Sequence, residues 1–297
     1  MRITRRGFAA LSLAAMLPRA VLAQSNGPSL MMRAIPRSGE KLPMVGLGTA
    51  SVFDNDNERT RTAATQVVAA LLASGGRLID TASSYGDAEL VLGNVMAASQ
   101  AREKLFIATK LESPDGEELK RSLGRLRTAK VDLLQLHNVR NPRQSLAQFK
   151  AWKEQGVCRY TGITSTFHGD FDAIEAVLGR EKPDFVQIDY SIDDREAEKR
   201  ILPLAAEVQA GVLTALPFGR GRLFRAVRGK PVPDWAADFA PSWAQFFIKY
   251  LLGDERVTAV IPGTSSAAHI QDNLGALRGR LPGPEERRRM VGFVSGL

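Results

Sequence analysis

The chain has 297 residues, of which 44% are hydrophobic and 24% are charged, and this composition argues against a disordered chain. The formal net charge is +8, but residues 1–23 hold four arginines and no acid, which leaves 36 basic against 32 acidic residues elsewhere. The remaining charge is scattered apart from the run Arg287-Arg288-Arg289, which is typical of a solvated helix face, so we expect no nucleic-acid partner. The single cysteine, Cys158, excludes an internal disulfide, and the three histidines lie too far apart for zinc-ligand spacing, so we expect no metal site.

Residues 1–23 have the pattern of an export signal. Arg5 and Arg6 precede an uncharged apolar stretch, which is too short to span a bilayer and ends near Ala23. A basic start, a short apolar stretch and a small residue at the cleavage position are typical of signal peptides, and the paired arginines resemble a twin-arginine signal. We therefore predict a twin-arginine-type signal peptide over 1–23, recognised by the export machinery, and a periplasmic or otherwise exported protein. An amphipathic N-terminal helix is the alternative.

The first elements expected after the signal form a small hairpin, with strands at 31–35 and 41–42 on either side of Ser38-Gly39. Eight short apolar runs follow, most of them roughly 25–35 residues apart, which is the length of a strand–helix unit. These predicted strands are 45–49, 78–80, 105–109, 131–136, 160–164, 185–189, 212–216 and 257–261. Helix-like stretches lie between them, including 62–73, 117–126, 146–154 and 243–252.

Alternating strands and helices predict a parallel sheet, and eight units predict that the sheet closes. The predicted fold is therefore α/β, a (β/α)8 TIM barrel with a short N-terminal β-hairpin that caps its N-terminal end, as a single domain over 24–297. A doubly wound sheet is the alternative. Gly46-Leu47-Gly48 follows an apolar run and Asp80 ends the next one, as in a dinucleotide-binding motif. However, Ser51 occupies the third glycine position of that motif, which makes the match weak.

Polar side chains follow three consecutive predicted strands. Asp80 and Tyr85 come after the second strand, Lys110 after the third and His137 after the fourth. Barrel active sites form at the carboxyl ends of the strands, so we expect these four side chains to converge. A phenol is a weak acid at neutral pH, but a nearby ammonium stabilises the phenolate. We expect Asp80 to hold Lys110 beside Tyr85, and His137 to bond a substrate carbonyl oxygen or relay a proton.

The segments Asp80-Thr81-Ala82 with Tyr85-Gly86, Ala108-Thr109-Lys110 and Leu136-His137 resemble the catalytic segments of the aldo-keto reductase family. They occur in the family's order and at similar spacing, and the resemblance extends over roughly residues 31–280. It implies an NAD(P)-dependent oxidoreductase that transfers a hydride between nicotinamide and a small carbonyl or alcohol substrate, such as an aldehyde, ketone or sugar. It also implies Tyr85 as the general acid, with Asp80, Lys110 and His137 as the other catalytic residues. We expect a monomer.

The resemblance implies a nicotinamide dinucleotide bound across the barrel mouth without a Rossmann unit. Residues after the fifth and sixth strands would contact the nicotinamide amide, the loop after the seventh would cover the pyrophosphate, and the segment after the eighth would hold the adenosine phosphate. The implied cofactor-binding residues are Gly48, Thr49, Thr164, Ser165, Gln187, Pro217, Phe218, Gly219, Gly221, Gly263, Thr264, Ser265, His269, Asp272 and Asn273. A plain strand-to-helix turn with Ser265 as N-cap remains an alternative for the last segment.

Three positions depart from the family pattern. Gly263 and His269 stand where many relatives carry cations that hold the 2′-phosphate, so we expect NADP(H) to be favoured over NAD(H) only modestly. Ala215 stands where some relatives stack an aromatic ring on the nicotinamide, and Phe218 is the candidate replacement.

Two other functions remain open at this stage. A cofactor-binding redox sensor or accessory subunit could use the same fold, although it would not need a proton donor. A hydrolytic barrel would need a carboxylate pair at its mouth, for which Asp80 and Glu89 are the nearest candidates in sequence.

Overall fold

The computed structural model describes residues 30–139 and 141–297, so the predicted export signal lies outside the described residues. The strands are β1 (Met32–Ala34), β2 (Lys41–Pro43), β3 (Leu47–Gly48), β4 (Leu78–Asp80), β5 (Phe106–Leu111), β6 (Val131–His137), β7 (Cys158–Ser165), β8 (Phe185–Asp189), β9 (Gly211–Ala215) and β10 (Ala259–Val260). The helices are α1 (Glu58–Ala73), α2 (Ala88–Ser99), α3 (Gly116–Arg125), α4 (Pro142–Glu154), α5 (Phe171–Glu181), α6 (Ile201–Glu207), α7 (Arg222–Ala226), α8 (Trp243–Leu252), α9 (Ala267–Gly275) and α10 (Pro284–Ser295). Strands and helices alternate along the chain from β3 to β9, as the sequence predicted, and two helices follow each of β9 and β10.

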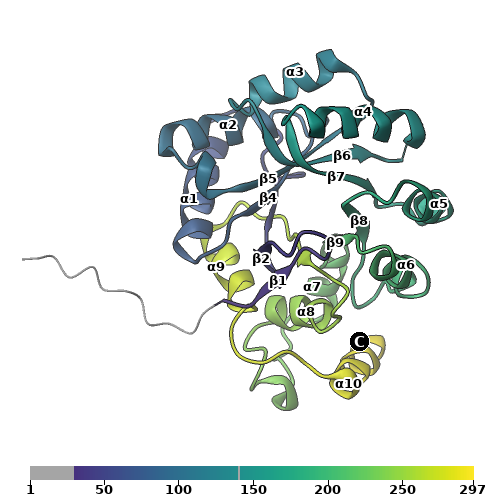
Figure 1. The fold of residues 1–297 in the computed structure, drawn as a ribbon. Coiled ribbons are helices and arrows are strands. Elements are labelled where there is room, and N and C mark those ends of the chain that lie inside the picture. Colours follow the sequence, from purple (N-terminus) through teal and green to yellow (C-terminus); the bar gives the residue numbers. More distant parts are fainter. Residues whose placement is uncertain (1–29, 140) are drawn as a thin grey trace, which may run out of the picture.

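Strands β3 to β10 pair in chain order, each parallel to the next. Isolated parallel bridges between Val45 and Val260, and between Gly48 and Gly263, join the first strand to the last. The Gly48 amide donates to the Pro262 carbonyl at 3.0 Å across this join. The sheet therefore closes with helices around it (Figure 1), which confirms the (β/α)8 barrel and excludes the open, doubly wound sheet.

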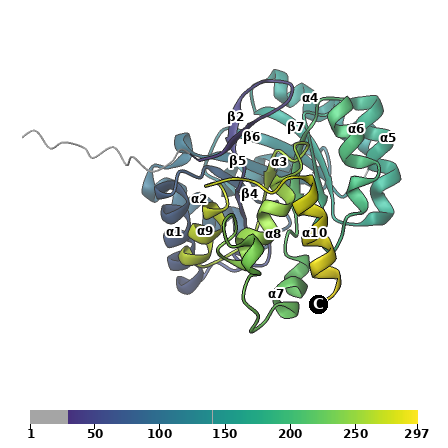
Figure 2. The same cartoon turned by 90° about the horizontal axis from the view of Figure 1, so that it is seen from below.

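The hairpin of β1 and β2 is antiparallel and covers one end of the barrel (Figure 2). Ile35 and Leu42 are fully buried there and pack in one cluster with strand residues such as Phe106 and Phe185. These apolar side chains fill the barrel interior below the strands' carboxyl ends. The predicted hairpin and its capping role are therefore confirmed, and the opposite end of the barrel is left free for a binding site.

Two helices begin earlier than predicted, at residues suited to the start of a helix, whereas α8 has the predicted bounds. Helix α1 begins at Glu58, four residues before the predicted start, because the Asn57 side chain accepts from the Thr60 amide at 3.0 Å. Helix α4 begins at Pro142, whose ring suits the first helical position. Within residues 30–139 and 141–297, no helix is both long and apolar enough to cross a membrane.

Candidate active site

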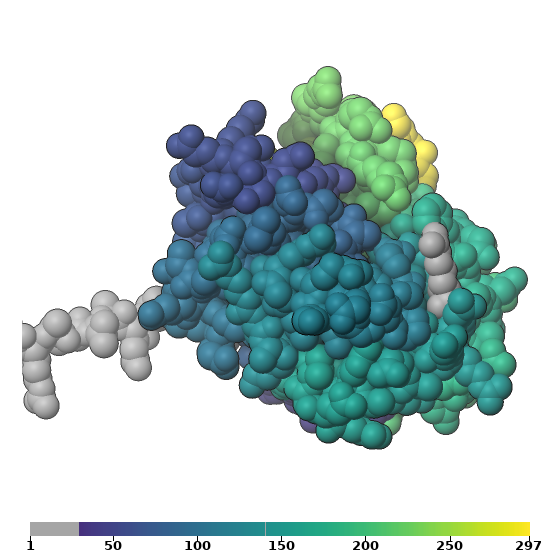
Figure 3. Space-filling view, turned by 90° about the horizontal axis from the view of Figure 1, so that it is seen from above, coloured from purple at the N-terminus to yellow at the C-terminus, as the bar shows by residue number. Residues whose placement is uncertain are grey.

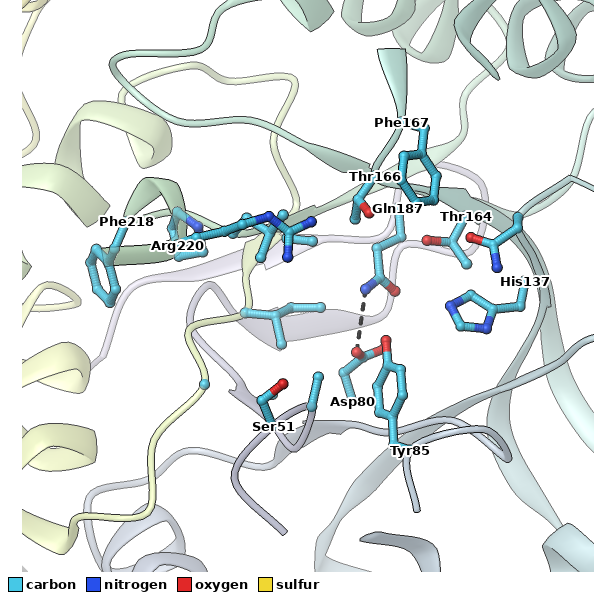
Figure 4. A pocket seen from close by; sticks show the side chains of 18 of the residues that line it. Ser51, Asp80, Tyr85, His137, Thr164, Thr166, Phe167, Gln187, Phe218 and Arg220 are labelled. Atoms are coloured by element: carbon cyan, nitrogen blue, oxygen red, sulfur yellow. Dashed lines mark hydrogen bonds between the residues drawn. The ribbon is translucent and has the colours of Figure 1, made fainter. Parts of the chain in front are cut away.

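A cavity of about 560 Å³ opens at the carboxyl ends of the barrel strands. Figure 3 shows two projections on this face, formed by the loop after β3 and the segment after β9. The cavity is lined by many of the residues that the sequence singled out: Gly48, Asp80, Tyr85, His137, Thr164, Gln187, Pro217, Phe218, Gly221 and Gly263. In Figure 4 the Tyr85 hydroxyl, the Asp80 carboxylate and the His137 imidazole face the same part of this cavity.

Asp80 and Lys110 form a buried ion pair at the cavity floor. The Lys110 ammonium donates to the Asp80 carboxylate at 2.7 Å and to the Thr81 carbonyl at 2.8 Å, and its side chain is 1% exposed. Burial alone would lower the pKa of Lys110, but the neighbouring Asp80 carboxylate raises this pKa above its ordinary value of 10.5. The lysine therefore stays positively charged at neutral pH, as the sequence-based hypothesis requires.

Tyr85 is placed over this ammonium. The Nζ atom of Lys110 lies 4.8 Å from the centre of the Tyr85 ring, close enough for a cation–π interaction. Tyr85 follows β4 within the turn that leads to α2, and the Gly86 that follows it has a φ of +52°. A Cβ at Gly86 would lie 2.3 Å from the Asp54 carbonyl oxygen, so only glycine permits this turn. The turn aims the phenol at the cavity.

Two buried glutamines support the ion pair. The Gln187 amide donates to Asp80 at 3.2 Å (Figure 4), and the Gln135 amide donates to the Gln187 side-chain oxygen at 2.8 Å. The strand register places these residues near one another. Lys110 of β5 is paired with Gln135 of β6, and Thr164 of β7 is paired with Gln187 of β8. Gln135 is not among the residues predicted from the sequence, although a polar residue inside the apolar run Leu133-Leu134-Gln135-Leu136 is a signal of such a role.

His137 ends β6, and its imidazole contacts the carboxylate of Glu112. Its Nδ1 atom lies 2.5 Å from Oε1 of Glu112, and the His137 ring packs edge-on against Tyr85 with 5.8 Å between ring centroids. Burial and the Lys110 ammonium hold the pKa of His137 below 6.5, although Glu112 acts in the opposite direction. Burial and the ammonium together favour the neutral form of the imidazole.

The loop after β9 has an unusual backbone. Leu216, Gly219, Arg220 and Gly221 all have positive φ, at 54°, 55°, 53° and 81°. Such successive left-handed residues turn the chain sharply at the cavity wall. Arg220 is not among the predicted site residues, yet its guanidinium extends into the cavity (Figure 4). Only the tertiary structure could show this, because nothing in the sequence distinguishes Arg220 from a solvated arginine.

The residues present fit an anionic dinucleotide. Gly48 and Gly263 lie against each other at the barrel seam, and a Cβ built on Gly263 would lie 3.5 Å from the Gly48 carbonyl oxygen. Neither residue places a side chain in the cavity there, which allows close approach of a ligand. Thr164 and Gln187 offer polar groups at the floor, and Arg220 offers a positive charge at the wall.

Other predicted cofactor residues do not line the cavity: Thr49, Ser165, Gly219, Thr264, Ser265, His269, Asp272 and Asn273. The Ser165 hydroxyl instead donates to Asp170 at 2.6 Å. The Asp272 carboxylate accepts from the Ser242 hydroxyl at 2.8 Å and from the Gln245 amide at 2.8 Å. These two side chains therefore hold neighbouring segments in place in the structure described here.

Two side chains near the proposed cofactor site can be placed individually. The N-cap of α9 is Ser266, which accepts from the His269 amide, and not Ser265 as the alternative supposed. Phe218 lines the cavity at the end opposite His137 (Figure 4).

The structure does not bring a carboxylate pair to the barrel mouth from Asp80 and Glu89. Glu89 is 1% exposed, accepts from Thr109 and Ser122, and does not line the cavity. The hydrolytic alternative built on this pair is therefore wrong. Among the described residues there is also no group of three histidine, cysteine or acidic side chains that could hold a metal ion.

Comparison with known proteins agrees with this site. The profile of the Aldo/keto reductase family matches residues 44–286. The chain is 30% identical over 270 residues to an aldo-keto reductase of Mycobacterium avium, covering 86% of this chain and 87% of the relative. It is 28% identical over 272 residues to the methylglyoxal reductase YeaE of Escherichia coli, covering 86% and 93%.

A solved structure has the same fold. A crystal structure of an aldo-keto reductase from Klebsiella pneumoniae in complex with NADPH superposes with a TM-score of 0.75 at 21% identity, covering 89% of this chain and 96% of that one. The chain belongs to the Aldo/keto reductase family and is an NAD(P)-dependent oxidoreductase.

Proposed function

We propose that this oxidoreductase reduces small aldehydes and ketones with NADP(H) favoured over NAD(H), and that Tyr85 is its proton donor. The observation that carries the proposal is the convergence of Asp80, Tyr85, Lys110 and His137 around one cavity. A bound nicotinamide would supply or accept the hydride. The chain's own residues then have to hold the carbonyl and deliver a proton to its oxygen.

Each residue has a distinct part in that proton delivery. The Tyr85 hydroxyl faces the cavity and is the donor to the carbonyl oxygen. The Lys110 ammonium, 4.8 Å from the ring centre, stabilises the negative charge that forms on the phenol oxygen as the proton leaves. The Asp80 carboxylate accepts from the Lys110 ammonium and from the Gln187 amide, which holds the lysine in place. Rigid support of this kind keeps the reacting groups aligned.

The competing proposal is a cofactor-binding sensor or accessory subunit, and turnover separates the two. We expect the purified protein to oxidise NADPH, followed by absorbance, when given methylglyoxal, which the Escherichia coli relative is named for reducing, or a simple aldehyde. Cofactor binding without turnover of any aldehyde or ketone offered would favour the sensor. We also propose a monomer, which light scattering can check against the 32.3 kDa of the full-length chain.

Cofactor preference should be measurable but modest. Many relatives carry a lysine and an arginine at the positions of Gly263 and His269. Gly263 has no side chain, and Nδ1 of His269 lies 3.4 Å from the Thr264 hydroxyl oxygen, so neither cation of those relatives is present here. We expect NADPH to bind more tightly than NADH, but by less than roughly 10³-fold, about 4 kcal/mol. Dissociation constants from fluorescence titration decide this, and a larger ratio would mean that other residues hold the 2′-phosphate.

Arg220 should contribute to both cofactors, because it belongs to the loop proposed to cover the pyrophosphate that they share. Arg220→Met should weaken NADPH and NADH binding alike, by about tenfold each. Arg222→Met is the matched control, since Arg222 pairs with Asp193 at 2.9 Å and does not line the cavity. Equal effects of the two substitutions would contradict the role given to Arg220.

We also propose that residues 1–23 direct export by the twin-arginine route and that the mature protein is periplasmic. The support is the sequence pattern around Arg5 and Arg6. Replacing both arginines by lysine keeps the charge and should trap uncleaved precursor in the cytoplasm. Cell fractionation and immunoblotting measure this, and normal export of the double variant would rule out the twin-arginine assignment.

A further inference from the structure

Phe167 is an exposed aromatic side chain on the wall of the catalytic cavity. Among the residues that the structure describes, four large hydrophobic side chains are exposed: Met32, Phe167, Phe224 and Leu297. Phe167 is the most exposed of these four, at 59%, and it alone of the four lines the cavity. Scattered exposed apolar side chains are ordinary on a protein surface, but one that lines a cavity offers apolar area that a ligand can cover.

The backbone around Phe167 is fixed on both sides. The Phe167 amide donates to the Ser165 hydroxyl oxygen at 3.1 Å, and the Phe167 carbonyl accepts from the Asp170 amide at 3.0 Å. The Ser165 hydroxyl donates in turn to the Asp170 carboxylate at 2.6 Å, which ties the end of β7 to the start of α5. The turn therefore holds the ring at the cavity before a ligand binds, and little backbone order has to be gained when the ring is covered.

Phe167 lies in the catalytic part of the cavity. Thr164, three residues earlier, lines the cavity and is paired with His137 of β6. In Figure 4, Phe167 and Tyr85 lie on opposite sides of the cavity, and Phe218 lies at the end far from His137. The position of Phe167 suits contact with the substituent of a carbonyl held at Tyr85 better than contact with the pyrophosphate of a cofactor.

The cavity wall opposite Phe167 is formed by small side chains. The loop after β3 contributes Ala50 and Ser51, and Figure 4 places Ser51 across the cavity from Phe167. The Ser51 amide donates to the Asp54 carboxylate at 2.9 Å, which holds this loop. Short side chains on one side leave room for a flat apolar group to pack against the aromatic ring on the other.

We propose that Phe167 is a specificity-determining residue whose ring covers an apolar, and best an aromatic, substituent on the carbonyl carbon of the substrate. The proposal rests on the proposed function, because it concerns the substrate of the same site. The polar groups of Tyr85 and His137 hold the carbonyl end, and Phe167 removes the apolar end from water. The site therefore favours aryl aldehydes over short-chain aldehydes.

Benzaldehyde and propanal test this preference, because they differ in the group that the ring would cover. The measured quantity is the ratio of their kcat/KM values with NADPH, and differences in intrinsic reactivity cancel when variants are compared. Phe167→Ala should lower the ratio of benzaldehyde to propanal about tenfold, the usual effect of one apolar pocket contact. Phe167→Tyr keeps the ring and should retain the ratio. Met32→Ala is the control, because it removes an exposed apolar side chain from the hairpin at the other end of the barrel and should leave the ratio unchanged.

Binding without turnover gives a second readout. Benzoate and acetate carry a carboxylate in place of the aldehyde and also differ in the group beside it. Calorimetry on the full chain loaded with NADP⁺ measures their dissociation constants. We expect benzoate to bind about tenfold more tightly than acetate, and Phe167→Ala to remove most of this difference. The affinity for NADPH should be the same in Phe167→Ala as in the unaltered protein, because the ring contacts the substrate and not the cofactor.

The two readouts separate failure of this proposal from failure of the proposed function. An unchanged ratio of benzaldehyde to propanal in Phe167→Ala would overturn the proposal even if the enzyme reduced both aldehydes. A fall in NADPH affinity as large as the fall in that ratio would assign the ring to the cofactor and would also overturn it. Absence of turnover with every aldehyde and ketone offered would count against the proposed reductase reaction. In that case the ratio of benzoate to acetate binding still decides whether Phe167 recognises an apolar substituent.

Discussion

Tyr85→Phe should lower the rate of carbonyl reduction by about 10²-fold or more, the usual effect of losing a general acid. The substitution removes the hydroxyl that faces the cavity and keeps the ring that packs beside His137 and over Lys110. Hydride transfer in a single turnover, followed by NADPH absorbance, measures this step without the influence of product release.

The same variant should bind the cofactor almost as well as the unaltered protein, because no part of the ring is lost. A large fall in cofactor affinity would show that the substitution disturbs the cavity and not only the chemistry. If Tyr85→Phe reduced a simple aldehyde at the original single-turnover rate, Tyr85 would not be the acid, and the proposed mechanism would fail even though the barrel is correct.

Lys110→Met should lower the reduction rate by about 10²-fold, comparable to removal of one preorganised charge-stabilising group. Methionine keeps the length of the side chain but removes the cation near the Tyr85 ring. Single-turnover rate measurements on this variant, with the unaltered protein and Tyr85→Phe as references, test the prediction.

The stability of Lys110→Met must be measured alongside its activity, because the Asp80–Lys110 ion pair is buried. Removing Lys110 alone leaves the Asp80 carboxylate, 5% exposed, without its cation, which should cost about 3–5 kcal/mol of stability. The double variant Asp80→Asn with Lys110→Met removes both charges and should recover part of that loss. A double variant that is stable yet as slow as Lys110→Met would separate the catalytic effect from the loss of stability. Recovery of the full rate in the double variant would contradict the role of Lys110.

Three of the candidate catalytic residues could be found from the sequence because each stands at the carboxyl end of a predicted strand. Asp80, Lys110 and His137 follow the apolar runs of three adjacent strands, and parallel strands bring such ends together. Their ion pair and the position of Tyr85 over Lys110 match the sequence-based hypothesis in detail. The extended cofactor site is a different case, because several of its predicted residues lie outside the cavity and their role stays a prediction.

The first and last barrel strands are shorter than the apolar runs predicted. The sequence predicted strands at 45–49 and 257–261, but β3 and β10 contain only two residues each in the structure. Residues count as strand only where a neighbour completes the ladder, and these two strands meet across the barrel seam through isolated bridges. Apolar runs predict burial well, but they cannot show how far pairing extends.

The sequence by itself determined the order of strands and helices, the closed barrel, the hairpin that caps it and the four catalytic candidates. These depend on hydrophobic periodicity and on polar residues at strand ends, which are properties of short segments. Only the tertiary structure decided that Gln135 supports Asp80 through Gln187, that Arg220 reaches into the cavity, and that Glu112 contacts Nδ1 of His137. Those contacts join residues from different strands and loops, and their geometry arises only once the barrel has closed.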